Sequence, residues 1–492
     1  MHTNPLQKTF VLLLLALLLV ACIGCARGEE TMPAATPEPI FIVTHAPQVE
    51  SIPTPIPEPQ LKYIFLFIGD GMGYNQVQTA SEALSADGRE PLSFLDFPVQ
   101  GSVKTNNVEG KVTDSAAAAT AISTGQKTVN GFLGLDSGKN RIETIAEALR
   151  NLGRKIGILT TVSLDHATPA GFFAHVDSRR SYATITDDLF ASGFDYFAGG
   201  GFHNTPDAPE LALENGYALI HSFEEAPVST EGKLILSSSL IFGDYGVLPA
   251  IDGGARTNWL KKATDLAITR LSVPEGFFMM VEGGRIDYFC HYNDAGSFVA
   301  ELLDIDEAIR SALVFYAQHP QETLILVTAD HETGDVTLRE GDRAALLRQV
   351  ISSDICDNTL VADSLAAKTP FEEALPLFVS AFGLDDLSKE ETALLKEAYA
   401  KTIAKNAPGN TSNEESGVYE PITTACINLV AARAGVRFGS GGHTQKDVPI
   451  YAIGIGSEFF GGTYENTNIH DAIFQAVRSE ERRVGKECRS RW

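Results

Sequence analysis

Cysteine is scarce in the sequence, and its spacing argues against one common class of metal site. Beyond the first 25 residues the only cysteines are Cys290, Cys356, Cys426 and Cys488. None of these four belongs to a C-x-x-C pair, so we do not expect a cysteine-based zinc site. A disulfide between Cys356 and Cys426 would suit an exported protein, but the sequence alone leaves that pairing open.

Positively charged residues are also few compared with negatively charged ones. The sequence has 38 lysines and arginines against 63 aspartates and glutamates, which gives a net charge of −25. No basic stripe offsets this balance, so nucleic-acid binding is not expected. A phosphate-bearing substrate is not excluded, because bound divalent cations can dominate the field around a site.

Apolar runs long enough to span a membrane are missing, and the nearest approach is Phe10–Val20. Its length is typical of the core of a signal peptide. The following Leu19-Val-Ala-Cys22 resembles the lipobox of bacterial lipoproteins, whose cysteine carries the lipid. We therefore predict an export signal over 1–22, a lipid anchor at Cys22 to a membrane, and a location in the cell envelope or at the cell surface. A plain cleaved signal peptide or an uncleaved anchor is the alternative.

The rest of the chain divides by composition. Residues 23–60 are rich in proline and threonine and predict an extended, disordered tether. Residues 61–480 predict one catalytic domain, within which 338–440 has charged helical patterns and is interpreted as an inserted cap beside the site. A peripheral helical layer is the alternative for that segment. The tail at 481–492 is basic, and we interpret it as a disordered end or as a segment appended to the natural sequence.

Short apolar runs alternate with helical patterns in the predicted catalytic domain. The strand candidates are 62–69, 155–161, 277–281, 323–329 and 449–454, and the helix candidates are 142–152, 300–318 and 471–477. Unbroken apolar strands are typical of a parallel sheet that is buried on both faces. The pattern predicts an α/β fold, a three-layer sandwich whose largely parallel central sheet is covered by helices on both faces.

Metal-binding residue types stand where these strands end. Asp70, Glu282 and Asp330 each end an apolar run, and His331 follows the last of them. Because ligands bind at the carboxyl ends of strands in such sheets, we expect these side chains to converge on one edge. Carboxylate and imidazole together suit Zn²⁺, and oxygen ligands alone suit Mg²⁺.

A candidate nucleophile precedes an alanine-rich run. Ser115 stands immediately before Ala116–Ile122, which predicts a helix that begins at the serine. Free N–H groups and the helix dipole at that end favour an alkoxide and an incoming anion. A plain helix cap is the alternative. No G-x-S-x-G elbow surrounds Ser115, so a hydrolase triad has little support.

Several motifs follow one another in a characteristic order. They are Ile68–Gly73, Thr113–Ala121, His166–Ala170, His175–Arg179, Val281–Asp287 with His291, Thr328–Gly334, and Gly441–Thr444 followed by Asp447. In this order and spacing the set resembles the alkaline phosphatases, from about Leu61 to Ile469. With His166–Ala170 and His175–Arg179 taken as one, six modest motifs in this order make a chance agreement very improbable.

The resemblance implies a set of metal ligands for two zinc ions and one magnesium ion. Asp287, His291 and His443 would hold the first zinc; Asp70, Asp330 and His331, with Ser115, the second; and Asp70 would bridge to a magnesium held by Thr168 and Glu282. His166 stands where some family members have Asp and others His. We expect it to act through a water rather than as a direct ligand.

The resemblance also implies the substrate-binding residues. Arg179 matches the family's phosphate-clamping arginine, and Asp114 would orient its guanidinium, which can grip two phosphoryl oxygens at once. Surface charges are the alternative for both residues. Tyr288 departs from the Lys or His that many members carry near the phosphate, which leaves the third-site metal preference and the pH optimum open.

The function implied is hydrolysis of phosphate monoesters through a phosphoserine at Ser115, with release of inorganic phosphate. Members of the family commonly pair, so a homodimer is one expectation. A phosphodiesterase of the same superfamily is the alternative, and a sulfatase is disfavoured because Ser115 lacks that family's following Pro and Arg. A lipoprotein that binds zinc or phosphate without turnover is the non-enzymatic alternative.

Overall fold

The structure is a computed structural model. It describes residues 60–203, 205–239, 241–243, 246–253, 258–407 and 418–489. The predicted export signal, Cys22 and all but the last residue of the predicted tether lie outside these ranges. Among the described residues, no helix combines the length and the apolar character that a membrane crossing requires.

A ten-stranded sheet forms the centre of the fold. Its strands lie in the order β16-β2-β15-β10-β1-β9-β3-β4-β6-β5. Their bounds are β1 (Tyr63–Gly69), β2 (Val99–Lys104), β3 (Lys155–Thr160), β4 (Tyr196–Gly199), β5 (Tyr217–Ile220), β6 (Lys233–Ser237), β9 (Phe277–Gly283), β10 (Thr323–Thr328), β15 (Val448–Gly454) and β16 (Gly462–Glu465). All five strand candidates from the sequence are present within a residue or two.

The middle of the sheet is parallel, as the apolar runs predict. β1 pairs in parallel with β9 on one side and with β10 on the other, and every residue of β1, β9 and β10 is buried. β15 is the exception, because it runs antiparallel to both of its neighbours, β10 and β2. The predicted largely parallel sheet is confirmed, with one reversed strand that periodicity could not reveal.

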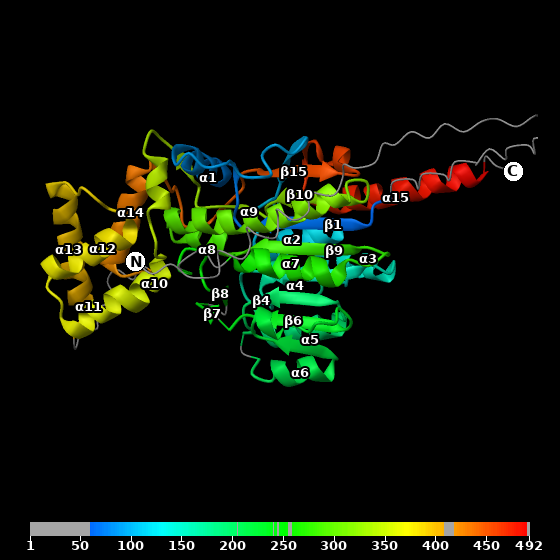
Figure 1. The fold of residues 1–492 in the computed structure, drawn as a ribbon, viewed down its shortest axis with the longest axis horizontal. Helices are drawn as coiled ribbons and strands as arrows, with labels where there is room; N and C mark the ends of the chain where they lie inside the picture. The colour runs from blue at the N-terminus through cyan, green and yellow to red at the C-terminus, as the bar shows by residue number, and fades with distance from the viewer. Residues whose placement is uncertain are drawn as a thin grey trace, which may run out of the picture. The chain divides into compact units, whose positions relative to one another are not determined.

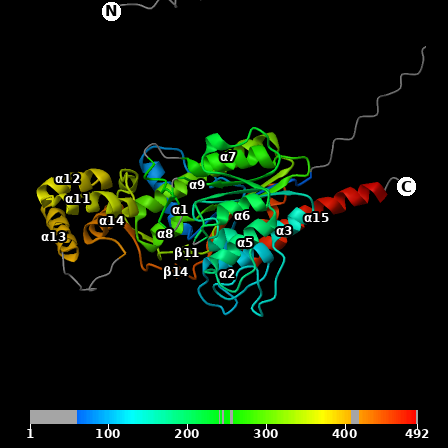
Figure 2. The same cartoon turned by 90° about the horizontal axis from the view of Figure 1, so that it is seen from below.

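Helices cover both faces of this sheet (Figures 1 and 2). One face carries α1 (Tyr74–Ala86), α7 (Trp259–Leu271) and α9 (Ala295–Gln318); the other carries α2 (Ser115–Thr124), α3 (Ile145–Asn151), α4 (Ala167–Ala170) and α15 (Thr467–Arg489). Two further helices, α5 (Tyr182–Ser192) and α6 (Ala208–Glu214), lie near β4, β6 and β5. The predicted three-layer α/β sandwich is therefore confirmed.

Short elements complete the sheet edge where the strand ends meet. Helix α8 (Arg285–His291) follows β9 directly, and there are three small antiparallel pairs, two of which join distant segments. The pairs are β7 (Ile241–Phe242) with β8 (Gly246–Val247), β11 (Glu332–Thr333) with β14 (His443–Thr444), and β12 (Thr337–Leu338) with β13 (Val436–Arg437).

The segment between β12 and β13 is helical, as its charged patterns predict. It comprises η3 (Arg343–Leu347), α10 (Ser353–Cys356), η4 (Asp357–Val361), α11 (Ala362–Ala367), α12 (Phe371–Phe382), α13 (Lys389–Lys405) and α14 (Pro421–Arg433). In Figure 1 these helices form the yellow and orange group on the left. We call residues 338–440 the helical insertion.

The structure bears on two points that the sequence left open. Cys356 and Cys426 are both buried and both free thiols, so they form no disulfide. α15 continues to Arg489 and includes most of the basic tail. The glutamates and arginines of that segment are good helix formers, which accounts for a helix at this end of the chain. That the segment is appended to the natural sequence stays a prediction.

Asp294 joins the helical insertion to the sandwich. It caps α9 by accepting hydrogen bonds from the Ser297 backbone N–H at 3.1 Å and from the Ser297 hydroxyl at 2.7 Å. Its carboxylate also accepts from Gln349 Nε2 at 2.9 Å and from the Ser353 N–H at 3.0 Å. Gln349 and Ser353 belong to the insertion, so this one buried carboxylate fastens the insertion to α9.

We expect Asp294→Ala to lower the free energy of unfolding by about 3 kcal/mol, because several buried donors lose their acceptor at once. Urea unfolding monitored by circular dichroism measures the change. The matched control Asp363→Ala removes an exposed carboxylate from α11 and should stay within about 0.5 kcal/mol of the parent. Equal stabilities for the two variants would contradict the assignment.

Candidate metal centre

The strand register brings the predicted acidic residues to one edge of the sheet. Ile68 of β1 lies beside Glu282 of β9 on one side and beside Thr328 of β10 on the other. Asp70 and Asp330 each follow their strand by two residues or fewer, and all three carboxylates are completely buried. The convergence that the sequence predicts at the carboxyl ends of these strands is present.

The first ligand group consists of Asp287, His291 and His443. The Nε2 atom of His291 lies 3.1 Å from Asp287 Oδ2 and 3.1 Å from His443 Nε2. The Nδ1 atoms of the two rings face outward, toward the Gly441 carbonyl at 2.7 Å and the Thr113 carbonyl at 3.0 Å. A carbonyl can only accept, so each Nδ1 is the protonated nitrogen and both Nε2 atoms are left to bind a cation.

The second group surrounds His331. Its Nε2 atom lies 3.1 Å from Asp330 Oδ2, 3.5 Å from Asp70 Oδ1 and 3.3 Å from Ser115 Oγ. Asp70 Oδ1 and Asp330 Oδ2 are buried and make no hydrogen bond. Buried carboxylate oxygens normally find a donor, so two such atoms turned toward one imidazole nitrogen fit a cation between them. Asp287 also lies within ligand distance of Asp70 and His331, which joins this group to the first.

The third group lies deeper, between β9 and α4. Thr168 donates to Asp70 Oδ2 at 3.2 Å, and Thr160 donates to Glu282 Oε2. Glu282 Oε1 is buried without a hydrogen bond, and His166 Nδ1 lies 3.9 Å from it. His166 therefore stands among the possible ligand atoms of this group. Both direct ligation and the water-mediated contact that the sequence analysis favours fit its position.

Burial raises the pKa of three carboxylates of these groups. Burial raises the pKa of Asp70 well above its ordinary value, and the negative charges of Asp330, Asp287 and Glu282 raise it further. Burial likewise raises the pKa of Glu282 to about 8 and that of Asp330 to about 6. Bound cations are the usual partners of such crowded buried acids. The residues present thus fit divalent metal ions.

The surroundings shift the pKa values of His291 and His331 in opposite directions. Burial lowers the pKa of His291, but the hydrogen bond to Asp287 outweighs burial and raises that pKa to about 9. Burial would also raise the pKa of Asp287, yet its hydrogen bond with His291 and the neighbouring imidazoles hold that pKa well below the ordinary value. Burial and the proximity of His443 lower the pKa of His331, which keeps that ring neutral and able to bind a metal.

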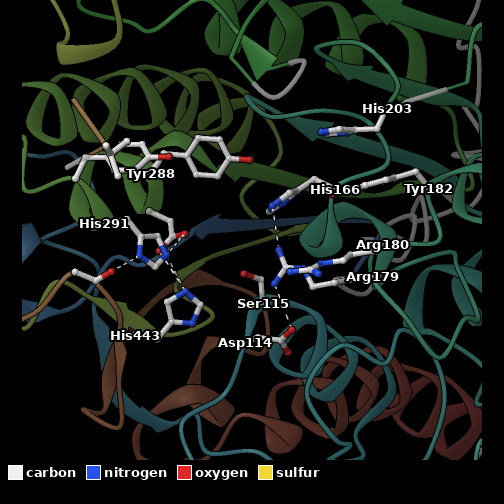
Figure 3. Close-up of a pocket in the computed structure, with 14 residues that line it drawn as sticks. Asp114, Ser115, His166, Arg179, Arg180, Tyr182, His203, Tyr288, His291 and His443 are labelled. Carbon is white, nitrogen blue, oxygen red and sulfur yellow. Dashed lines mark hydrogen bonds and ion pairs between the residues drawn. The ribbon is translucent and has the colours of Figure 1, made fainter. Parts of the chain in front are cut away.

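Ser115 and Arg179 both lie beside Asp114 (Figure 3). Ser115 is the first residue of α2, and Asp114 caps the helix by accepting from the Ala117 N–H at 3.0 Å. Asp114 Oδ2 also accepts from Arg179 Nη1 at 3.3 Å. Asp114 therefore contacts both the first turn of α2 and the guanidinium of Arg179, which the resemblance implies that it orients.

Arg179 is held as a permanent cation. Burial would lower its pKa, but the charges of Asp114 and Asp70 raise it above the ordinary value. Its Nη2 atom donates to His166 Nε2 at 3.2 Å. A guanidinium has five N–H donors, so contacts with Asp114 and His166 leave others for an anion.

A cavity of about 640 Å³ opens over Ser115. Its lining residues are Asp114, Ser115, His166, Arg179, Arg180, Tyr182, His203, Asp287, Tyr288, His291, Tyr292, Val418, Gly441 and His443. The more deeply buried Asp70, Thr168, Glu282, Asp330 and His331 are not in its lining. Neither Tyr182 nor His203 stands in a motif that the sequence analysis recognised.

Two residues of the motif Thr328–Gly334 that were given no role from the sequence support the ligands. Thr333 donates from Oγ1 to Asp287 Oδ1, and the same oxygen lies 3.2 Å from His331 Nδ1. Glu332, which is buried, accepts from the Thr444 hydroxyl, from Gln76 Nε2 at 3.0 Å and from the Val336 N–H at 3.1 Å. β11 and β14 are paired so that Thr333 lies opposite His443. Glu332 is therefore a positioning residue for both metal-binding segments.

A glycine is required next to Asp70. Gly71 has φ of +73°, and its N–H donates to Asp330 Oδ1 at 3.1 Å. A Cβ atom there would lie 2.9 Å from Asp287 Oδ1 and 2.9 Å from Thr333 Oγ1. The backbone can approach the centre this closely only without a side chain.

Comparison with known proteins points to one family. A family model described as alkaline phosphatase matches residues 61–195 and 241–479. Alkaline phosphatase 3 of Bacillus subtilis is 30% identical over 436 residues, which cover 85% of this chain and 89% of that protein. Alkaline phosphatase of Escherichia coli is 31% identical over 352 residues, which cover 59% of this chain and 74% of that protein.

Solved structures agree with these sequence matches. A cold-active alkaline phosphatase from a psychrophilic Shewanella species superimposes with a TM-score of 0.73 at 26% identity, over 84% of this chain and 99% of that one. The alkaline phosphatase of the Antarctic bacterium TAB5 has a TM-score of 0.60 at 27% identity, over 85% of this chain and 99% of that one.

We expect Glu332→Gln to weaken metal retention by roughly tenfold, because residues that orient ligands commonly matter to that extent. The amide cannot accept all the hydrogen bonds that the carboxylate accepts. Divalent metal released to a fluorescent chelator over time measures the effect. Glu340→Gln, an exposed change in the nearby loop, is the matched control. Identical release from both variants would contradict the positioning role.

Proposed function

The chain belongs to the alkaline phosphatase family, and on that premise we propose that it hydrolyses phosphate monoesters through a phosphoserine formed at Ser115. Family membership makes the chain a metal-dependent phosphomonoesterase. The covalent step rests on one observation: Ser115 Oγ lies 3.3 Å from His331 Nε2, at the N-terminus of α2 and beside Arg179. A hydroxyl so placed adjoins both the second ligand group and the anion-binding arginine.

Two zinc ions and one magnesium ion complete the proposed centre. Asp287, His291 and His443 would hold the first zinc; Asp70, Asp330 and His331, with Ser115, the second; and Asp70, Thr168 and Glu282 the magnesium, with His166 beside them. The first two sets mix imidazole and carboxylate, and the third offers oxygen atoms. A histidine-to-glutamate variant of the TAB5 enzyme is described with Mg in its M3 site. When bound, these cations would lower the pKa of a hydroxyl and neutralise charge on the departing oxygen.

The chain's own residues position the substrate. Arg179 would grip two non-bridging oxygens of the phosphoryl group, because its guanidinium is planar and Asp114 fixes its orientation. The free N–H groups at the start of α2 would add to the attraction of the anion. Phosphoryl transfer needs mainly such positioning and charge neutralisation.

The reaction proceeds in two displacements. In the first, Ser115 Oγ forms a bond to phosphorus while the ester P–O bond breaks, and the proton that Ser115 gives up ends on the leaving oxygen. In the second, water adds to phosphorus from the side that the leaving group vacated. The Ser115–phosphorus bond then breaks, a proton of the attacking water ends on Ser115, and inorganic phosphate leaves. A diester has one charged oxygen fewer for Arg179 to hold, so the monoester is the better fit.

Export, a lipid anchor and a homodimer also belong to the proposed function. The apolar run at 10–20 and Cys22 favour export and a lipid anchor, and both lie outside the described residues. The proline-rich segment at 23–60 would then act as a tether to the catalytic domain at 61–480. A homodimer remains the expectation taken from the family.

We expect Ser115→Ala to lower kcat for an aryl phosphate by more than about a hundredfold, because the covalent route is lost. Ser123→Ala makes the same change in the same helix, away from the cavity, and should keep most of the activity. Acid quench of the parent during turnover, followed by mass spectrometry, should show phosphate on the peptide that contains Ser115. Near-parental turnover by Ser115→Ala would eliminate the covalent route.

Metal removal tests the cofactor assignment separately. We expect prolonged chelation to abolish turnover, and zinc with magnesium together to restore more activity than either ion alone. Elemental analysis of the restored protein should find zinc and magnesium in a ratio of about two to one, as the proposed ligand sets require. Activity that survives complete removal of divalent metal would refute the assignment.

A further inference from the structure

The cavity over Ser115 is larger than a phosphoryl group needs. Its volume of about 640 Å³ lies within the range of pockets that enclose whole small molecules. A water molecule occupies about 30 Å³ in the liquid, and a phosphoryl group is only a few times larger. Most of the cavity is therefore available to the part of the substrate that leaves.

Aromatic rings line that remaining space. Tyr182 stacks on His203 with ring centroids 4.2 Å apart and an angle of 12° between the planes. The His166 ring lies 6.1 Å from that of Tyr288, edge to face. In Figure 3, Tyr182 and His203 lie on one side of His166 and Tyr288 on the other, while Ser115 and Asp114 lie below. The two carboxylates of the lining, Asp114 and Asp287, belong to the phosphate-binding end of the cavity.

The helical insertion adds to this wall. Val418 lines the cavity and is 69% exposed. The next residue, Tyr419, is buried and packs edge to face against Tyr292, with ring centroids 5.1 Å apart. The Tyr419 hydroxyl donates to Asp354 Oδ1, which anchors the ring inside the insertion. Tyr419 therefore restrains the ring of Tyr292.

The opposite side of the wall is fixed as well. Asp165 is completely buried and accepts from the His203 backbone N–H at 2.7 Å and from His203 Nδ1 at 3.0 Å. Tyr182 rests on the ring so held. Rings that are already ordered lose little conformational freedom when a ligand packs against them.

We propose that Tyr182, His203, Tyr288, Tyr292 and Val418 form a subsite for the leaving group, and that it selects phosphate monoesters of flat aromatic groups. The inference rests on the proposed function, because the in-line reaction sends the leaving group away from Ser115 and toward this wall. Flat rings pack against tyrosine and histidine faces or edges more favourably than alkyl groups of similar size. The phosphate end would stay the same for every substrate.

Stable phosphonates test this subsite without turnover. Titration calorimetry on the metal-loaded protein would give Kd for phenylphosphonate, methylphosphonate and inorganic phosphate. We expect Tyr292→Leu and Tyr182→Leu each to raise Kd for phenylphosphonate by about three- to tenfold. Kd for the other two ligands should change by less than about twofold, since neither reaches the rings. Tyr316→Leu, a partly buried tyrosine on α9 away from the cavity, is the matched control and should leave all three values unchanged.

The results test the aromatic subsite and the proposed function separately. A phenylphosphonate affinity that is unchanged, or that falls only in parallel with the affinity for phosphate in both variants, overturns the aromatic subsite. The proposed function is judged on its own by turnover of an aryl phosphate by the parent protein. A parent that turns over substrate but shows no selective loss in the variants would retain the function and lose the subsite.

Discussion

Burial of several carboxylates at one point is the constraint on which the rest of this structure depends. Asp70, Glu282 and Asp330 come from the ends of three adjacent strands and lie entirely away from water. Burial raises the pKa of all three, and the charges of Asp330 and Glu282 raise that of Asp70 further, so the group would resist ionisation without compensating positive charge. Divalent cations supply that charge most directly, and Arg179 adds to it from the cavity side. Bound metal ions would therefore allow these carboxylates to stay ionised although they are buried.

The surrounding elements orient the metal-binding atoms toward these buried carboxylates. Backbone carbonyls hold the outer nitrogens of His291 and His443, so their other nitrogens face inward. Thr333 contacts Asp287 and His331 together, and Glu332 ties β11 to β14. Support therefore comes from short segments that are far apart in the chain. A change in one of them would disturb ligands contributed by another.

The cavity separates two tasks. In the proposed function its phosphate end consists of Ser115, Arg179 and the first ligand group, Asp287, His291 and His443, and would serve any phosphate monoester. Its outer wall consists of aromatic rings and one residue of the helical insertion, and this wall meets the part that differs among substrates. Selectivity could then change through the wall without any change in the reacting groups. The insertion, which begins and ends beside β12 and β13, is joined to the sandwich through Asp294.

The sequence by itself determined the strands, the acidic residues at their ends and the serine before an alanine-rich helix, because apolar runs and local order are written in consecutive residues. It also indicated Arg179 and Asp114 as substrate-binding residues, because the order and spacing of its motifs resemble those of the alkaline phosphatases. The antiparallel direction of β15, the stacking of Tyr182 on His203 and the reach of Val418 into the cavity were decided only by the tertiary structure. These features depend on contacts between segments distant in the chain, for which periodicity carries no signal. The position of His166 near Glu282 is of the same kind, since only the packing of α4 against β9 sets how close the two side chains come.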